Sequence, residues 1–201
     1  MKICSLMIIL LLVGGTATRV FAHPRPDAVV IKLYGQIVAR HPLGIPKSSD
    51  KNAIRPFLSK RLIQEFKVAQ ECEDDYVRKH ADDDGKPEFD WMERGLFSGS
   101  NEKASPFAAV VERTEPKKDG YIQVYVKLTY KDTYKTYGRP IKHPSVFHWH
   151  VAAIVIREAG RFVVDDVVQY NEGSTEIKYS ISSAFIGCDG SHWVGEKVTD
   201  R

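Results

Sequence analysis

The chain has 201 residues, and its 29 lysines and arginines nearly balance its 26 aspartates and glutamates, which gives a formal net charge of +3. This balance excludes the strongly basic surface that is typical of proteins binding nucleic acids or anionic lipids. A chain of this length, with 43% hydrophobic residues, can bury a full hydrophobic core as one domain.

The first 22 residues have the layout of a secretory signal peptide. Lys2 supplies a positive start, an apolar run follows, and Val20-Phe21-Ala22 fits a signal-peptidase site. We therefore expect cleavage before His23 and a periplasmic or secreted product. Residues 23–201 are expected to form a single α+β domain without a membrane span, because no later apolar run is long enough to cross a bilayer.

Helical patterns fill the first part of this domain. A helix is predicted over residues 26–40, where apolar side chains recur every three or four positions. A short helical piece that breaks at Pro56 follows. The longest helix is predicted from about residue 59 to residue 80, because Ser59 is a favourable N-cap and an apolar stripe follows it.

The second half of the chain changes to the period of two that is typical of strands. A polar and aromatic loop over residues 81–99 precedes it. Strands are predicted at residues 107–113, 121–130, 146–157 and 161–170, and a helix-like segment at residues 177–185. Helices followed by an antiparallel meander indicate an α+β fold, with the helices packed on a strongly curved sheet.

Two cysteines, Cys72 and Cys188, remain after removal of the signal. In an oxidising compartment we expect a disulfide between them, which would connect the long helix to the C-terminal tail. The alternative is two separate thiols. Neither cysteine belongs to a CxxC pair or lies beside a histidine in the sequence, so a nucleophilic role is not favoured.

Four segments of the chain carry a family resemblance: residues 57–62, 86–98, 148–150 and 160–167. With these segments the chain resembles exported bacterial proteins of unknown function in the nuclear transport factor two-like superfamily. The resemblance implies a cone-like α+β barrel with a pocket between the helices and the sheet. It implies no activity, because that superfamily includes enzymes, carriers and interaction domains.

Polar and aromatic side chains on the predicted elements are candidates for lining this pocket: Tyr34, Trp91, Tyr125, His148, His150 and Asp166. His148 and His150 are two residues apart on a predicted strand, so both rings point to one face. Together with Asp166 they could bind a metal, but we favour two polar positions that line a wet pocket or the solvent face, and we expect no metal and no cofactor.

The adjacent carboxylates Asp165 and Asp166 point to opposite faces of a strand and cannot act as a close pair. The one that points inward could be a general base, but a structural ion pair or cap is the favoured interpretation. An acidic run at residues 82–84, with Glu88 and Asp90, could bind calcium, yet it lacks EF-hand spacing and a solvated loop is favoured.

The remaining aromatic residues are either core or a partner surface, and core is favoured. They are Phe89, Phe97, Trp149, Trp193, Tyr121, Tyr130, Tyr134 and Tyr137. The sequence contains no phosphate-binding glycine loop, GxSxG, HExxH or CxxC.

The leading hypothesis is a non-enzymatic, exported binding or interaction module that uses a pocket between the long helix and the sheet. Its partner is an unknown small molecule or protein, and a periplasmic immunity-type protein is one narrower version. The alternative is an isomerase, dehydratase or hydrolase that uses an inward Asp or His, with Tyr34 or Tyr125 as a hydrogen-bond donor. An envelope-associated structural protein is a third option. A homodimer is one possible assembly, and the sequence does not decide the oligomeric state.

Overall fold

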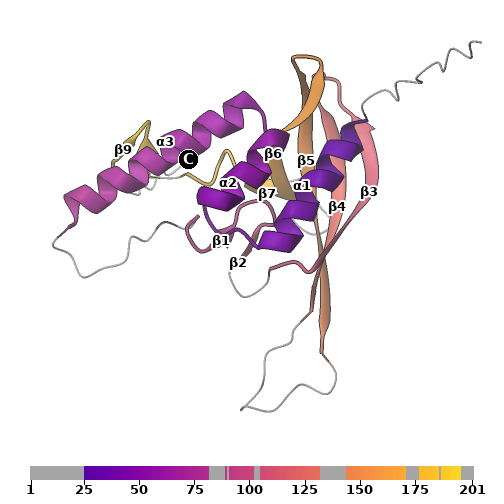
Figure 1. Cartoon of the computed structure of the whole chain (residues 1–201), viewed down its shortest axis with the longest axis horizontal. Coiled ribbons are helices and arrows are strands. Elements are labelled where there is room, and N and C mark those ends of the chain that lie inside the picture. The colour runs from indigo at the N-terminus through magenta and orange to yellow at the C-terminus, as the bar shows by residue number, and fades with distance from the viewer. Residues whose placement is uncertain are drawn as a thin grey trace, which may run out of the picture.

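The computed structural model describes residues 25–81, 89, 91–101, 105–131, 144–170, 177–185 and 187–195. The expected signal peptide, the acidic run at residues 82–84 with Glu88 and Asp90, and the tyrosines at 134 and 137 lie outside these ranges. The fold is α+β, as the sequence predicts, with helices first and a five-stranded antiparallel sheet after them (Figure 1).

Helices α1 and α3 begin and end close to the residues that their sequence signals indicate. Helix α1 spans Pro26–Arg40, α2 spans Ser48–Ile54, the 3-10 turn η1 spans Arg55–Phe57, and α3 spans Lys60–Lys79. Pro26 occupies the first turn of α1, and His41 ends this helix in the left-handed conformation. Ser59 caps α3, because its Oγ accepts a hydrogen bond from the Leu62 N–H at 3.0 Å.

The sheet has the order β3-β4-β5-β6-β7, and every neighbouring pair is antiparallel. Its strands are β3 (Ala108–Pro116), β4 (Ile122–Lys131), β5 (Val146–Glu158), β6 (Arg161–Tyr170) and β7 (Ile177–Ser180). The first four form the predicted meander. Two short hairpins add β1 (Arg94–Gly95) with β2 (Ser100–Asn101), and β8 (Cys188–Asp189) with β9 (His192–Trp193).

The helix-like segment predicted at residues 177–185 is wrong. Residues 177–180 form β7 and complete the sheet at its far edge, and a turn follows at 181–184. The backbone of β7 pairs with that of β6, where Tyr179 lies opposite Gln169. Pairing with a strand that is distant in sequence outweighs the local helical pattern of a segment this short.

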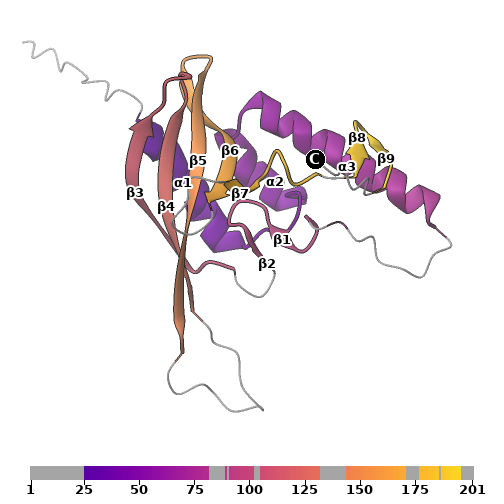
Figure 2. The same ribbon diagram turned by 180° about the vertical axis from the view of Figure 1, so that it is seen from behind.

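Helix α1, rather than the longer α3, covers the sheet. It lies across β3, β4 and β6, whereas α3 extends beyond the sheet and packs against β8 and β9 (Figures 1 and 2). The core between α1 and the sheet contains fully buried residues such as Leu33, Val126 and Val155. The opposite face of the sheet carries no helix among the described residues (Figure 2).

The expected disulfide is present. Cys72 of α3 and Cys188 of β8 have their sulfur atoms 2.02 Å apart and connect positions separated by 116 residues. No helix in the described part of the chain is long and apolar enough to cross a membrane.

A candidate binding groove between the first helix and the edge strand

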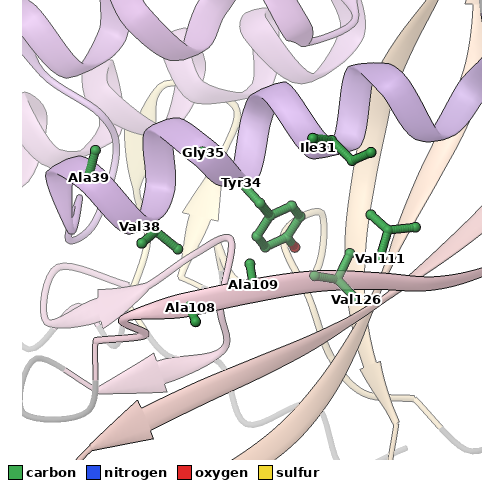
Figure 3. Close-up of a pocket in the computed structure, with 9 residues that line it drawn as sticks. All are labelled: Ile31, Tyr34, Gly35, Val38, Ala39, Ala108, Ala109, Val111 and Val126. Carbon is green, nitrogen blue, oxygen red and sulfur yellow. The ribbon is translucent and has the colours of Figure 1, made fainter.

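A groove of about 420 Å³ lies between α1 and the edge of the sheet (Figure 3). Small residues create it. Gly35 and Ala39 come from α1, and Ala108 and Ala109 come from β3, so the helix and the strand face each other with little side-chain volume between them. Ile31, Val38, Val111 and Val126 add larger apolar walls.

Tyr34 lines this groove but has a structural role. Its ring is 2% exposed, and its hydroxyl donates a hydrogen bond to the backbone oxygen of Phe97 at 2.8 Å. Burial, with a smaller contribution from Tyr179, raises the pKa of Tyr34 well above its ordinary value. The phenol therefore stays protonated and remains a hydrogen-bond donor.

The Tyr34 bond is one of three that hold the same backbone segment. Tyr179 of β7 donates to the oxygen of Leu96 at 3.3 Å, and the Trp149 indole of β5 donates to the oxygen of Ser98 at 2.7 Å. Three elements that are distant in sequence therefore fix three successive carbonyl groups at residues 96–98. The bond to this segment holds the Tyr34 ring in its position beside the groove.

The edge strand β3 forms the other side of the groove. Among the described residues it pairs only with β4, so its outer backbone edge has no strand beside it. Residues 108–111 are Ala-Ala-Val-Val and carry no charge, and Val110 is 57% exposed. The second half of the strand has an irregular register after Val111 and carries Glu112, Arg113 and Glu115, which are features that protect an edge from pairing.

Three of the predicted pocket residues lie on the other face of the sheet. Tyr125, His148 and His150 alternate with the buried Val126 and with its neighbours on the helix-covered face, so their side chains point away from α1. Alternation along a strand does not show which of its two faces a helix covers, and the packing of α1 on the sheet decides it.

Their contacts on that outer face are local and polar. The Arg113 guanidinium lies 3.5 Å from the centre of the Tyr125 ring, and the Tyr125 hydroxyl donates to Gln123 at 3.0 Å. His150 lies 3.3 Å from Glu112, and His148 lies 3.1 Å from the hydroxyl of Thr129. Within the described ranges, no group of three or more His, Cys, Asp or Glu side chains could hold a metal ion.

Asp166 binds backbone amides instead of facing a cavity. Its Oδ1 accepts hydrogen bonds from the N–H groups of Val167 at 2.7 Å, Ile181 at 3.0 Å and Ser182 at 3.3 Å. Burial raises the pKa of Asp166, and the hydrogen bonds from Ser182 and Val167 oppose this shift. The carboxylate fixes the turn after β7, and its neighbour Asp165 forms an ion pair with Arg61 at 2.9 Å.

Trp91 is buried in an aromatic cluster beside α3. Its ring is 2% exposed and lies 4.4 Å from the ring of Phe89 and 5.5 Å from that of Phe185, measured between ring centres. Its Nε1 has no hydrogen-bond partner among the described residues. The structure thus places Trp91 in the packing of α3, away from the α1–β3 groove.

Sequence reasoning missed the small residues that create the groove. A glycine in the middle of a predicted helix and two alanines at the start of a predicted strand were the available signals, because both reduce side-chain volume where core packing would favour larger groups. No model of a known protein family matches this chain, and no curated protein shows significant similarity to it.

Proposed function

We propose that this protein is an exported interaction module that binds an extended apolar segment of a protein partner along β3. The observation that carries the proposal is the uncharged, unprotected half of the β3 edge at residues 108–111, which runs beside an apolar groove. An added strand would gain backbone hydrogen bonds from β3 and would place alternate side chains over the groove.

Export is supported by the signal-like first 22 residues and by the Cys72–Cys188 disulfide. A cone-like sheet of the nuclear transport factor two-like kind is supported by register irregularities in three strand pairs, β3–β4, β5–β6 and β6–β7, because bulges increase twist and bend strands. A periplasmic immunity-type protein, whose partner segment belongs to a toxin, is the narrower form of the proposal.

The test uses nine-residue peptides, the length of β3, selected from a random display library against the purified protein. We expect the selected peptides to carry apolar residues at alternate positions. Gly35→Trp should abolish their binding by filling the groove, whereas Gly35→Ala should preserve it, because a Cβ at residue 35 meets no atom within 4 Å. Binding should also slow amide hydrogen exchange at residues 108–111.

Selected peptides that bind Gly35→Trp with unchanged affinity, or that protect other amides, would contradict the proposal. Gel filtration over a range of concentrations provides the remaining check. A homodimer that protects residues 108–111 would mean that a second copy of the chain occupies the edge, and the proposed partner segment would then be wrong.

A further inference from the structure

A second and larger cavity, of about 540 Å³, is lined by residues of α2, η1 and α3 and of the segment that precedes α2. This volume falls within the range of about 300–1,000 Å³ that is typical of small-molecule sites. This cavity is separate from the α1–β3 groove, because the two share no lining residue.

The floor of this cavity is apolar. It is formed by Ile45, Ile54, Leu58, Ile63 and Phe66, and of these Ile54 and Leu58 are 0% and 2% exposed. The backbone beneath the floor is fixed, because Leu58 bridges to Val164 of β6 and the Ser59 N–H donates to the Val164 oxygen at 2.9 Å. The floor can therefore receive the apolar part of a ligand without rearrangement.

The rim of the same cavity is cationic. Lys47, Lys51, Arg55 and Lys67 line it, together with the single carboxylate of Glu71. Two of the four cations have partners: Lys47 lies 2.9 Å from Glu73, and Lys67 lies 3.6 Å from Glu71.

Lys51 and Arg55 are different, because neither forms an ion pair with any residue that the structure describes. They are four residues apart, in the last turn of α2 and at the start of η1, so two like charges share one side of a short helical segment. Such a pair is unfavourable in isolation and becomes favourable when an anion lies between its members. The planar guanidinium of Arg55 suits the two oxygens of a carboxylate or a phosphate.

We propose that the α2–α3 cavity binds an amphipathic anion, with its apolar body on the floor and its carboxylate or phosphate between Lys51 and Arg55. This assignment does not rest on the peptide-binding function proposed above. A free fatty acid and a phosphate-bearing lipid fragment both have this chemistry, and the experiment distinguishes them.

Three probes with the same dodecyl chain, each used below its micelle-forming concentration, provide the test: dodecanoate, dodecyl phosphate and the neutral dodecyl maltoside. Isothermal titration calorimetry measures their binding to the purified protein. We expect one anionic amphiphile to bind per chain, more tightly than the maltoside. Preference for dodecanoate would identify a fatty-acid site, and preference for dodecyl phosphate would identify a phospholipid-derived ligand.

The double variant Lys51→Gln/Arg55→Gln removes the proposed anion-binding pair. Loss of two charge-assisted contacts should weaken binding of the preferred anion about tenfold or more. Lys32→Gln/Lys118→Gln removes the same total charge at exposed positions that do not line the cavity, and it should leave the affinity unchanged. Both substituted pairs are exposed, so both proteins should fold.

Three results would overturn the proposal: no saturable binding of either anion, equal affinity for the neutral amphiphile, or an unchanged affinity in the Lys51→Gln/Arg55→Gln variant. A matching loss in the Lys32→Gln/Lys118→Gln control would also overturn it, because binding would then depend on overall charge rather than on this pair of side chains.

Discussion

Removal of the Cys72–Cys188 disulfide should greatly destabilise the protein. The perturbation is the double variant Cys72→Ala/Cys188→Ala, which leaves no single thiol to form mixed disulfides. The two positions lie in different parts of the molecule, because Cys72 is fully buried in α3 and Cys188 belongs to the hairpin of β8 and β9. The bond therefore restricts most of the unfolded chain.

The magnitude follows from the length of the closed loop. For a separation of 116 residues, the chain-entropy relation gives a loss of about 5 kcal/mol in the free energy of unfolding at 25 °C. In a domain of this size, that loss corresponds to a fall in Tm of about 10–20 °C. The hairpin keeps other anchors, because the Trp193 N–H donates to Asp75 at 3.1 Å and the Trp193 ring lies 4.7 Å from that of Phe89.

The assay is urea unfolding followed by circular dichroism and by tryptophan fluorescence. We expect coincident transitions, a lower midpoint and a larger m-value, since the unfolded chain exposes more surface without the cross-link. Wild-type protein reduced with dithiothreitol is the control for lost sulfur packing. A loss below about 1 kcal/mol with an unchanged m-value would refute the loop-entropy reasoning.

Three further predictions concern single residues. Gly35→Ala should raise the free energy of unfolding by about 0.5–1 kcal/mol, because the glycine lies inside α1 and a Cβ there meets no atom within 4 Å; a lower Tm would contradict this. Ser59→Ala should cost about 1–2 kcal/mol in urea unfolding by removing the cap to the Leu62 N–H, and an unchanged midpoint would show that the cap is dispensable. The hydrogen bond from Lys79 holds the pKa of Asp75 far below its ordinary value of 3.8, so the stability that this carboxylate provides is present above pH 3.8 and is lost as the pH falls below it. Thermal melts should therefore show Asp75→Asn less stable than wild type at pH 7, with a difference that shrinks below pH 3.8, and a constant difference would count against this ion pair.

The elements with strong local signals were predictable from sequence alone. Ser59 caps α3 as its residue type and position suggest, and β6 occupies residues 161–170 as its apolar pattern indicates. The pairing of Cys72 with Cys188 was also predictable, because only these two cysteines lie outside the first 22 residues, which have the layout of a signal peptide. Residues 177–180 were missed, since a four-residue strand has too few positions to reveal its period.

The candidate site was less predictable. Alternation along β4 and β5 shows that Tyr125 and Val126 point in opposite directions, but it does not say which face a helix will cover. The strand pattern places Asp166 on β6 but does not show whether its carboxylate lines a pocket or has a structural role. Only the position of the turn after β7 shows that the carboxylate binds backbone amides.

The sequence by itself therefore determined the fold class, most element boundaries and the disulfide, because these depend on residue types and on periods within short windows. The tertiary structure alone decided that α1 rather than α3 covers the sheet, and that small residues of α1 and β3 meet to form a groove. It also brought Lys51 and Arg55 to the rim of an apolar cavity. These features depend on which surfaces meet, and the packing of elements distant in sequence fixes that choice.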